Sequence, residues 1–250
     1  MDMSFYTAAV GAWQQQQRLD IHANNIANVN TPGYRARISS FSSLMNRELQ
    51  GVDEDIRRGA GAKVQQDELD FRFVGLNNTG NSLNFSITGE GFFALLDPAT
   101  GEISYTRDGT FILTNVLSAE DVANWEPGMS GTWRLSDASG RYVLGRDGAP
   151  IDVTTTGTAD LTGVDFGIGV FDFINHNGFL SASQNRHYPV EKNRQVMIGT
   201  GKVVQGALEL SNTDLAYEIS KVIETQRSFQ SLLRMVTTSD EVETTVTNLR

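Results

Sequence analysis

The chain has 250 residues, of which 39% are hydrophobic and 20% charged, a composition typical of a folded protein with one large or two modest domains. Its formal net charge of −10 argues against a nucleic-acid partner, because phosphate binding requires a basic face. The same charge argues against docking on anionic lipid, and no apolar run approaches the length of a membrane span. Cysteine is absent, so disulfides and thiolate metal sites are excluded.

The first 30 residues have the apolar spacing of a helix that pairs with another helix. Residues recur with alternating spacings of three and four, and small or polar side chains interrupt the seam. The seam consists of Phe5, Ala8, Ala12, Gln15, Leu19, His22, Ile26 and Val29. Thr31, Pro32 and Gly33 are predicted to end the helix, since proline lacks a donor and glycine favours a turn. The chain start lacks the basic and apolar regions of a secretory signal, so we expect no cleaved signal peptide.

Asparagines gather in the last turns of this predicted helix. They are Asn24, Asn25, Asn28 and Asn30. Asparagine is a poor helix former, so helix propensity does not account for them. We expect a hydrogen-bonding role for these amides; the alternative is a frayed helix end whose asparagines cap into the turn.

Residues 36–75 are predicted to be a connector, extended or partly helical, and not an independent domain. The segment lacks sustained periodicity. Its acidic cluster, Asp53, Glu54 and Asp55, is not followed by a ligand pattern, so a solvated turn is favoured over a metal site.

Residues 76–205 indicate an antiparallel β-rich domain, a sandwich or a barrel-like module. Short apolar or alternating runs are separated by turns rich in glycine, aspartate and proline. Strands are expected within residues 83–87, 92–96, 103–106, 111–113, 133–135, 142–144, 164–173 and 196–198. With helices at both ends, the fold class is α+β.

The C-terminal segment, residues 206–250, carries a second predicted helix. Ser211 and Asp214 have the spacing of an N-cap and its N3 partner, flanked by Leu210 and Leu215. The apolar seam then runs through Leu215, Ile219, Val222, Gln226, Phe229, Leu233 and Val236. A phase slip at residues 237–239 is expected to leave the helix continuous. The alternative to pairing with the N-terminal helix is an ordinary amphipathic helix on the β domain.

Motifs for catalysis are not found, and we predict no catalytic, metal or cofactor site, hence no enzyme and no small-molecule substrate. The string from Gly89 to Ala94 matches a dinucleotide fingerprint, but a strand and Pro98 follow it where a helix would be needed. A carboxylate-pair hydrolase stays open, because paired acids converge only in space.

Several stretches resemble the rod and hook proteins of the bacterial flagellum. The first runs from Ala23 to Arg35 and includes Asn24, Asn25, Ala27, Asn28, Asn30, Thr31, Pro32, Gly33 and Tyr34. Further stretches, in the same order as in that family, are residues 79–93, 105–111, 206–212, 226–230 and 240–241. The opening residues and the length are most like a proximal-rod protein; a distal-rod or hook member is the alternative.

The resemblance implies an axial structural protein. In such proteins paired terminal helices form an inner tube and β domains pack outside it, which implies a division into residues 1–35, 36–75, 76–205 and 206–250. Implied partners are other flagellar rod proteins, copies of the same chain and the type III export apparatus, and the implied location is the basal body, with no membrane insertion. We predict that assembly uses the helix seams, at Phe5, Leu19, Ile26, Leu215, Ile219, Val222, Phe229, Leu233 and Val236.

Residues 116–136 depart from the family pattern and contain Trp125 and Trp133. Exposed tryptophans favour a second reading, in which the β domain binds a glycan and the helices are a stalk.

Overall fold

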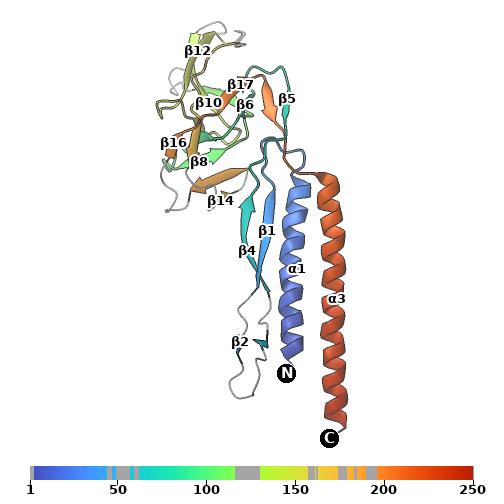
Figure 1. Cartoon of the computed structure of the whole chain (residues 1–250). Helices are drawn as coiled ribbons and strands as arrows, with labels where there is room; N and C mark the ends of the chain where they lie inside the picture. Colours follow the sequence, from blue (N-terminus) through green and yellow to red (C-terminus); the bar gives the residue numbers. More distant parts are fainter. Residues whose placement is uncertain are drawn as a thin grey trace. The chain divides into compact units, whose positions relative to one another are not determined.

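The computed structural model describes residues 3–43, 47–48, 57–58, 62–115, 130–156, 161, 163–173, 179–182, 185–189 and 196–249. A long helix lies near each end of the chain, α1 (Met3–Ala27) and α3 (Leu215–Asn248), and strands lie between them, so the predicted α+β class is confirmed (Figure 1). The chain divides into two compact units, one formed by residues 1–29, 36–70 and 213–250, the other by residues 30–35 and 71–212.

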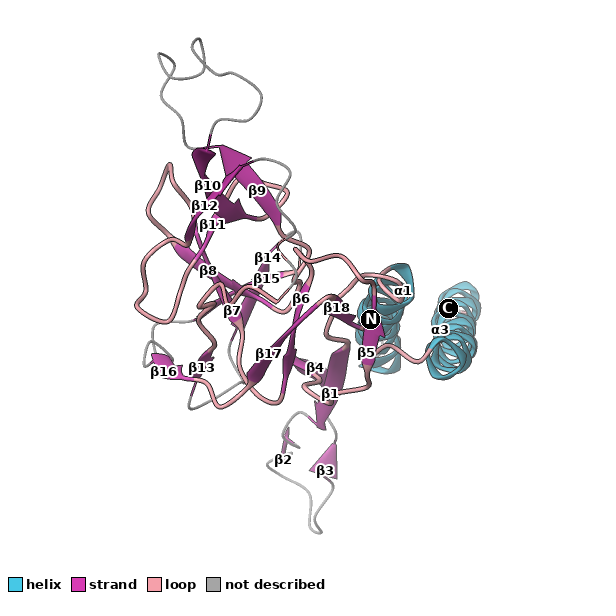
Figure 2. Cartoon of the chain, turned by 90° about the horizontal axis from the view of Figure 1, so that it is seen from above, coloured by secondary structure: helices cyan, strands magenta, loops and turns pink. Residues whose placement is uncertain are grey.

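The first unit is built on the pairing of α1 with α3. Position 11 of α1 lies against Leu232 and His22 lies against Glu218, so the two helices run antiparallel. End-on, they lie side by side (Figure 2). The helices have 25 and 34 residues, which correspond to lengths of roughly 37 and 51 Å.

An antiparallel ribbon of β1 (Arg37–Ser43) and β4 (Ala62–Leu69) completes this unit and packs against α1. Arg37 pairs with Leu69 at one end, and the register shifts between Ile38 and Ser40. The connector is therefore extended here. The short strands β2 (Arg47–Glu48) and β3 (Arg57–Arg58) pair with each other.

The start of α3 differs from the sequence prediction. The N-cap is Asp214 and not Ser211: its carboxylate accepts the backbone N–H groups of Ala216 and Tyr217 over 2.9 and 3.2 Å. The chain is still extended before it, and the N–H of Asn212 donates to the carbonyl of Tyr34. The helix then continues through residues 237–239, as predicted.

The second unit contains an antiparallel sheet with the strand order β12-β10-β11-β7-β8-β15-β14, and β9 also pairs with β10 (Figure 2). These strands are β7 (Phe93–Leu96), β8 (Ile103–Thr106), β9 (Ile112–Asn115), β10 (Ser130–Ser136), β11 (Tyr142–Val143), β12 (Asp152–Thr156), β14 (Phe179–Ala182) and β15 (Arg186–Pro189). Three two-stranded ribbons accompany it: β5 (Leu76–Asn78) with β18 (Ala207–Glu209), β6 (Phe85–Thr88) with β17 (Lys202–Gln205), and β13 (Phe171–Phe173) with β16 (Val196–Ile198).

One expected strand, residues 164–173, is mostly not a strand. Only Phe171–Phe173 forms β13, because Gly163 and Gly167 adopt positive φ angles of 79° and 63° that bend the preceding segment. The bend carries Phe166 and Ile168 into the core.

Two apolar clusters hold this unit together. The larger one contains Phe85, Ile87, Phe93, Leu95, Phe111, Leu135, Val143, Ile151, Phe166, Ile168 and Val170. The smaller one is mainly aromatic. In it, the rings of Tyr105 and Phe173 pack edge to face, with their centroids 4.7 Å apart. Burial raises the pKa of the Tyr105 phenol above its ordinary value.

Replacing Phe93 with alanine is expected to lower the free energy of unfolding of the β domain by about 3–5 kcal/mol, because the ring is fully buried and its loss leaves a cavity. Denaturant unfolding of the full chain measures this. Phe73→Ala is the matched control, since that ring is exposed, and an equal loss in both variants would contradict this assignment of the core.

Candidate functional site

Asn25 joins α1 to strand β1. Its side-chain amide donates to the carbonyl oxygen of Arg37, and its side-chain oxygen accepts the Arg37 backbone N–H, each over 2.9 Å. The amide also donates to Oε1 of Glu218 over 2.9 Å. Asn25 is fully buried, and these bonds explain why an asparagine stands in a helical turn that disfavours it.

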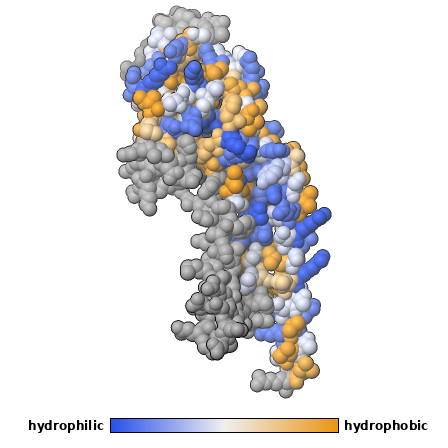
Figure 3. Space-filling view, in the orientation of Figure 1, coloured by the Kyte–Doolittle hydropathy of each residue, from blue (hydrophilic) through white to orange (hydrophobic). Residues whose placement is uncertain are grey.

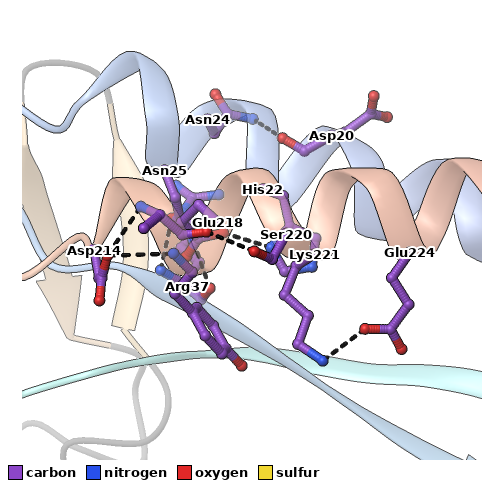
Figure 4. Close-up of polar contacts among 12 residues, drawn as sticks. Asp20, His22, Asn24, Asn25, Arg37, Asp214, Glu218, Ser220, Lys221 and Glu224 are labelled. Atoms are coloured by element: carbon purple, nitrogen blue, oxygen red, sulfur yellow. Dashed lines mark hydrogen bonds and ion pairs between the residues drawn. The ribbon is translucent and has the colours of Figure 1, made fainter.

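Glu218 reaches from the first turn of α3 toward α1. Its Oε1 binds Asn25, and its Oε2 lies 2.5 Å from Nδ1 of His22 (Figure 4). Both Glu218 and His22 are buried. Turning or sliding α3 would leave this carboxylate buried without its donors, at a penalty of several kcal/mol. The Glu218 contacts therefore fix one rotation and one register of α3 on α1.

Farther along the helices, small side chains allow close approach. Ala8 and Ala12 are buried, and a Cβ added at Gly11 would lie 3.4 Å from the methyl groups of Leu232. Thr225 of α3 is also buried. The α1–α3 interface thus combines small and polar residues with a modest number of apolar ones, a pattern that selects register more than it adds stability.

The predicted seam residues are placed in two groups. Buried or half-buried positions of α3 are Glu218, Lys221, Val222, Thr225, Ser228, Phe229, Leu232, Val236 and Ser239. Of the predicted seam, Val222, Phe229 and Val236 belong to this face, and Phe5, Leu19 and Ile26 of α1 are half-buried. Leu215, Ile219 and Leu233 are exposed, because Glu218 and Thr225 occupy the inward positions instead. Their role in assembly stays a prediction.

In the second unit, Gly33 makes the turn after α1 possible. Its φ is +64°, and a Cβ there would lie 2.4 Å from the carbonyl of Arg107, so a side chain does not fit. Its N–H donates to the backbone carbonyl of Glu209 over 2.8 Å. Asn185 donates to the carbonyl of Pro32 over 3.3 Å. The positive φ and the nearby Arg107 carbonyl explain why the turn needs glycine, and the two hydrogen bonds hold the turn in place.

Glu209 lies between two arginines in the same unit. Its Oε1 accepts from Arg35 over 2.6 Å and its Oε2 from Arg107 over 3.1 Å, and all three side chains are at most 3% exposed. Arg35 also donates to the carbonyl of Arg72, and Arg107 to that of Gly89, each over 2.8 Å. The carboxylate thus connects β18, the segment after the Gly33 turn and the segment after β8.

The remaining signature residues are less buried. Asn24 and Asn28 donate to the carbonyls of Asp20 and Asn24, one turn back in each case. Ala27 and Asn30 are exposed, and Thr31 and Tyr34 are half-buried. Of the four asparagines, Asn25 therefore carries the strongest hydrogen-bonding role.

Sequence reasoning missed the two buried glutamates and the arginines that bind Glu209. Arg35, Arg107 and Glu209 each lie in a different family-like stretch, and Glu209 is the one acid in its stretch. A buried acid and a buried arginine in apolar surroundings have to find partners, and that requirement is the signal that could have connected these stretches.

In the part of the chain that the structure describes, no group of three or more His, Cys, Asp or Glu residues could hold a metal ion. Among the described segments, neither helix is both long and apolar enough to cross a membrane. Trp133 is half-buried on β10, opposite Val153 and Asn115, and Trp125 lies outside the described residues.

Replacing Asn25 with alanine is expected to destabilise the helix unit by about 1–3 kcal/mol, because the backbone groups of Arg37 lose their partners. Amide hydrogen exchange measures this as faster exchange at Arg37. Asn24→Ala is the matched control, since the exposed Asn24 side chain binds the Asp20 carbonyl and not the Arg37 backbone. Equal exchange at Arg37 in both variants would contradict the role of Asn25.

Replacing Glu209 with alanine is expected to destabilise the chain by about 3–5 kcal/mol, since two buried guanidinium groups lose their counter-ion. Denaturant unfolding measures the loss. Asp152→Ala is the control, because it removes a more exposed ion pair with Arg134. The hydrogen bond from Arg134 lowers the pKa of Asp152. Loss of this pair is expected to cost less than about 1 kcal/mol of stability. A small effect at Glu209 would overturn its role as a shared counter-ion.

Comparisons with known proteins agree with this geometry. Residues 5–35 match the family model described as "Flagella basal body rod protein", and residues 204–249 match "Flagellar basal body rod FlgEFG protein C-terminal". The first match contains Asn25, Gly33 and Arg35, and the second contains Glu209 and Glu218.

The similarity to individual known proteins extends over nearly the whole chain. The flagellar basal-body rod protein FlgG of Bacillus subtilis (strain 168) is 29% identical over 99% of this chain and 98% of its own length. The FlgG protein of Buchnera aphidicola subsp. Schizaphis graminum is 28% identical over 96% of each chain. The flagellar hook-basal body complex protein FlhP of Bacillus subtilis is 26% identical over 99% of each. At both ends and over nearly its whole length, the chain is thus similar to the flagellar basal-body rod proteins.

Proposed function

We propose that this chain is a structural subunit of the flagellar basal-body rod and polymerises through its paired terminal helices to form part of the axial drive shaft for motility. The observation that carries the proposal is the uncovered apolar surface of α3. Leu215, Ile219 and Leu233 are exposed even though α3 is paired along its other face with α1.

The geometry of an α-helix explains why α1 cannot cover this surface. Leu215 and Leu233 are 18 residues apart, which is five full turns, so both lie on the same side of α3. Ile219 lies one turn after Leu215, between the two leucines and on nearly the same side. This side adjoins the face that α1 covers, and a further helix is needed to bury it.

A second exposed set lies toward the C-terminal end of α3. Met235, Val242, Val246 and Leu249 are exposed, and apolar surface gathers at this end of the helix (Figure 3). Surfaces that match a different surface on the next subunit generate an open filament and not a closed ring. Exposed apolar stripes on a long helix pair therefore support a subunit that polymerises.

Association with other rod proteins and with copies of the chain follows from this proposal, as does a place in the basal body. We also propose export by the flagellar type III apparatus, a proximal position in the rod and a structural, non-enzymatic role. The family relationship and the exposed helix surface support these points.

Replacing Leu233 with aspartate is expected to leave the β domain folded and to abolish incorporation into the rod. The side chain is 43% exposed in the subunit, so the substitution places a charge on the proposed contact surface with little effect on the core. The measurement is swimming in soft agar together with immunodetection of the chain in purified basal bodies.

Ser231→Asp is the matched control, because it places the same acidic residue in the same helix at another exposed position. The serine is already polar, so the control removes no apolar side chain from the proposed contact surface. This variant is expected to swim normally. Swimming of the Leu233→Asp variant at the rate of the control would show that this side of α3 is not an assembly contact.

A further inference from the structure

A groove of about 570 Å³ lies in the second unit, beside strand β17 and the bent segment before β13. Its apolar lining includes Phe85, Phe166, Ile168 and Val170, which are largely buried members of the main core. Val164 and Ile198 line the same groove and are exposed. The groove is thus an opening in the surface through which part of the apolar core is reached.

Hydrogen bonds hold the two sides of this groove in place. The side-chain oxygen of Gln205 accepts the N–H of Gly163 over 2.8 Å. Its amide donates to the carbonyls of Ser82 and Leu161 over 2.7 and 2.9 Å. Gly199 and Gly201, which also line the groove, donate to the carbonyls of Val170 and Glu90. A groove that is fixed before binding loses less entropy when it is filled.

The charges on the groove are predominantly positive. Arg146 and Lys202 line it, are exposed, and form no ion pair with any described residue. Among the described lining residues there is one carboxylate, Asp165, which accepts the N–H of Gly167 over 2.9 Å. The described lining therefore carries two cations and one carboxylate beside an apolar floor, a small positive excess in a chain whose net charge is −10.

Strand β16 extends the apolar surface beyond the groove. It is hydrogen-bonded to β13, and within the described residues no strand pairs with its other edge. Val196 and Met197 are exposed, and Ile198 is 83% exposed. Soluble proteins usually protect such an edge with charge or cover it, because an uncovered apolar edge strand binds other chains.

We propose that this groove and the adjoining β16 edge bind an acidic, apolar segment of a second copy of this chain. An apolar side chain of that segment covers Ile198 and the groove floor, and its carboxylates pair with Arg146 and Lys202. This contact lies in the β domain, so it adds to the helix contacts, and it rests on the proposed function, which brings copies together.

Charge complementarity identifies the occupant. The chain has 30 acidic and 20 basic residues, so the surfaces of two copies repel one another on average. Arg146 and Lys202 attract carboxylates of an acidic second copy, whereas most of the surface repels them. The cations therefore set where two β domains meet, and the apolar floor supplies the burial that holds them.

A photo-crosslinking experiment tests this proposal directly. The chain has no cysteine, so Met197→Cys provides one attachment point for a benzophenone maleimide on β16 while Ile198 stays in place. Basal bodies are purified from cells that carry this variant as their only copy and are then irradiated. The expected product is a dimer of the chain whose cross-linked peptide contains carboxylates next to an apolar residue.

Charge reversal is the second arm of the experiment. Arg146→Glu combined with Lys202→Glu is expected to lower the dimer yield by about fivefold or more, the effect of losing two exposed ion pairs. Arg146→Lys combined with Lys202→Arg keeps both charges and is expected to preserve the yield.

The outcomes separate this proposal from the proposed function. If basal bodies contain the chain but the cross-links are internal, lead to another protein, or ignore charge reversal, the groove proposal is wrong and the rod assignment stands. If the chain, with or without Met197→Cys, is absent from basal bodies, the rod assignment itself is wrong.

Discussion

The buried carboxylate of Glu218 is the constraint on which the helix unit depends. A carboxylate without water needs donors, and the chain supplies them from His22 and Asn25, 196 and 193 residues earlier in the sequence. Since Asn25 also binds both backbone groups of Arg37, one layer of polar side chains ties α3, α1 and β1 together. Apolar contacts alone would permit several registers, whereas this layer permits one.

The second unit uses the same chemistry at Glu209. Arg35 and Arg107 hold that carboxylate, and Gly33 brings the chain close enough to hydrogen-bond its backbone. Both glutamates lie in the C-terminal family match, and three of their partners, His22, Asn25 and Arg35, lie in the first match. Arg107 lies outside both matches. The two matched regions are thus distant in sequence but bound to each other within each unit.

This arrangement suits a subunit that assembles. Polar contacts fix the helix pair inside the subunit, so the apolar stripes on the outside of α3 remain available to neighbours. If the helix pair relied on those stripes for its own stability, burial within the subunit and burial between subunits would compete. Under the proposed function, one face of α3 sets the register within a copy and another face binds the neighbouring copy.

Much of the fold could be predicted from the sequence. Apolar spacing located both helices, and the cluster of asparagines indicated a hydrogen-bonding role that Asn25 fulfils. Turn residues located β6 to β11 and β16, whereas β5, β12, β14, β15, β17 and β18 were not expected. The seam on α3 was only partly right, since hydrophobic patterns do not anticipate that Glu218 and Thr225 face inward. The N-cap was placed three residues early, at Ser211, because the bond between Asn212 and Tyr34 is not visible in sequence. Likewise, the partners of Glu209 are 174 and 102 residues away, so pairing them requires the structure.

A cross-link between α1 and α3 within one chain, in an assembled rod, tests the central claim most directly. Gly11 and Leu232 face each other in the subunit, and in a cysteine-free chain Gly11→Cys with Leu232→Cys gives a unique pair for a short bifunctional thiol reagent. The account predicts that rods treated with this reagent contain the chain mainly as an internally linked monomer. Links formed only between different chains would contradict it, because α1 and α3 would then be paired across subunits and Glu218 would not fix the register of its own helix pair.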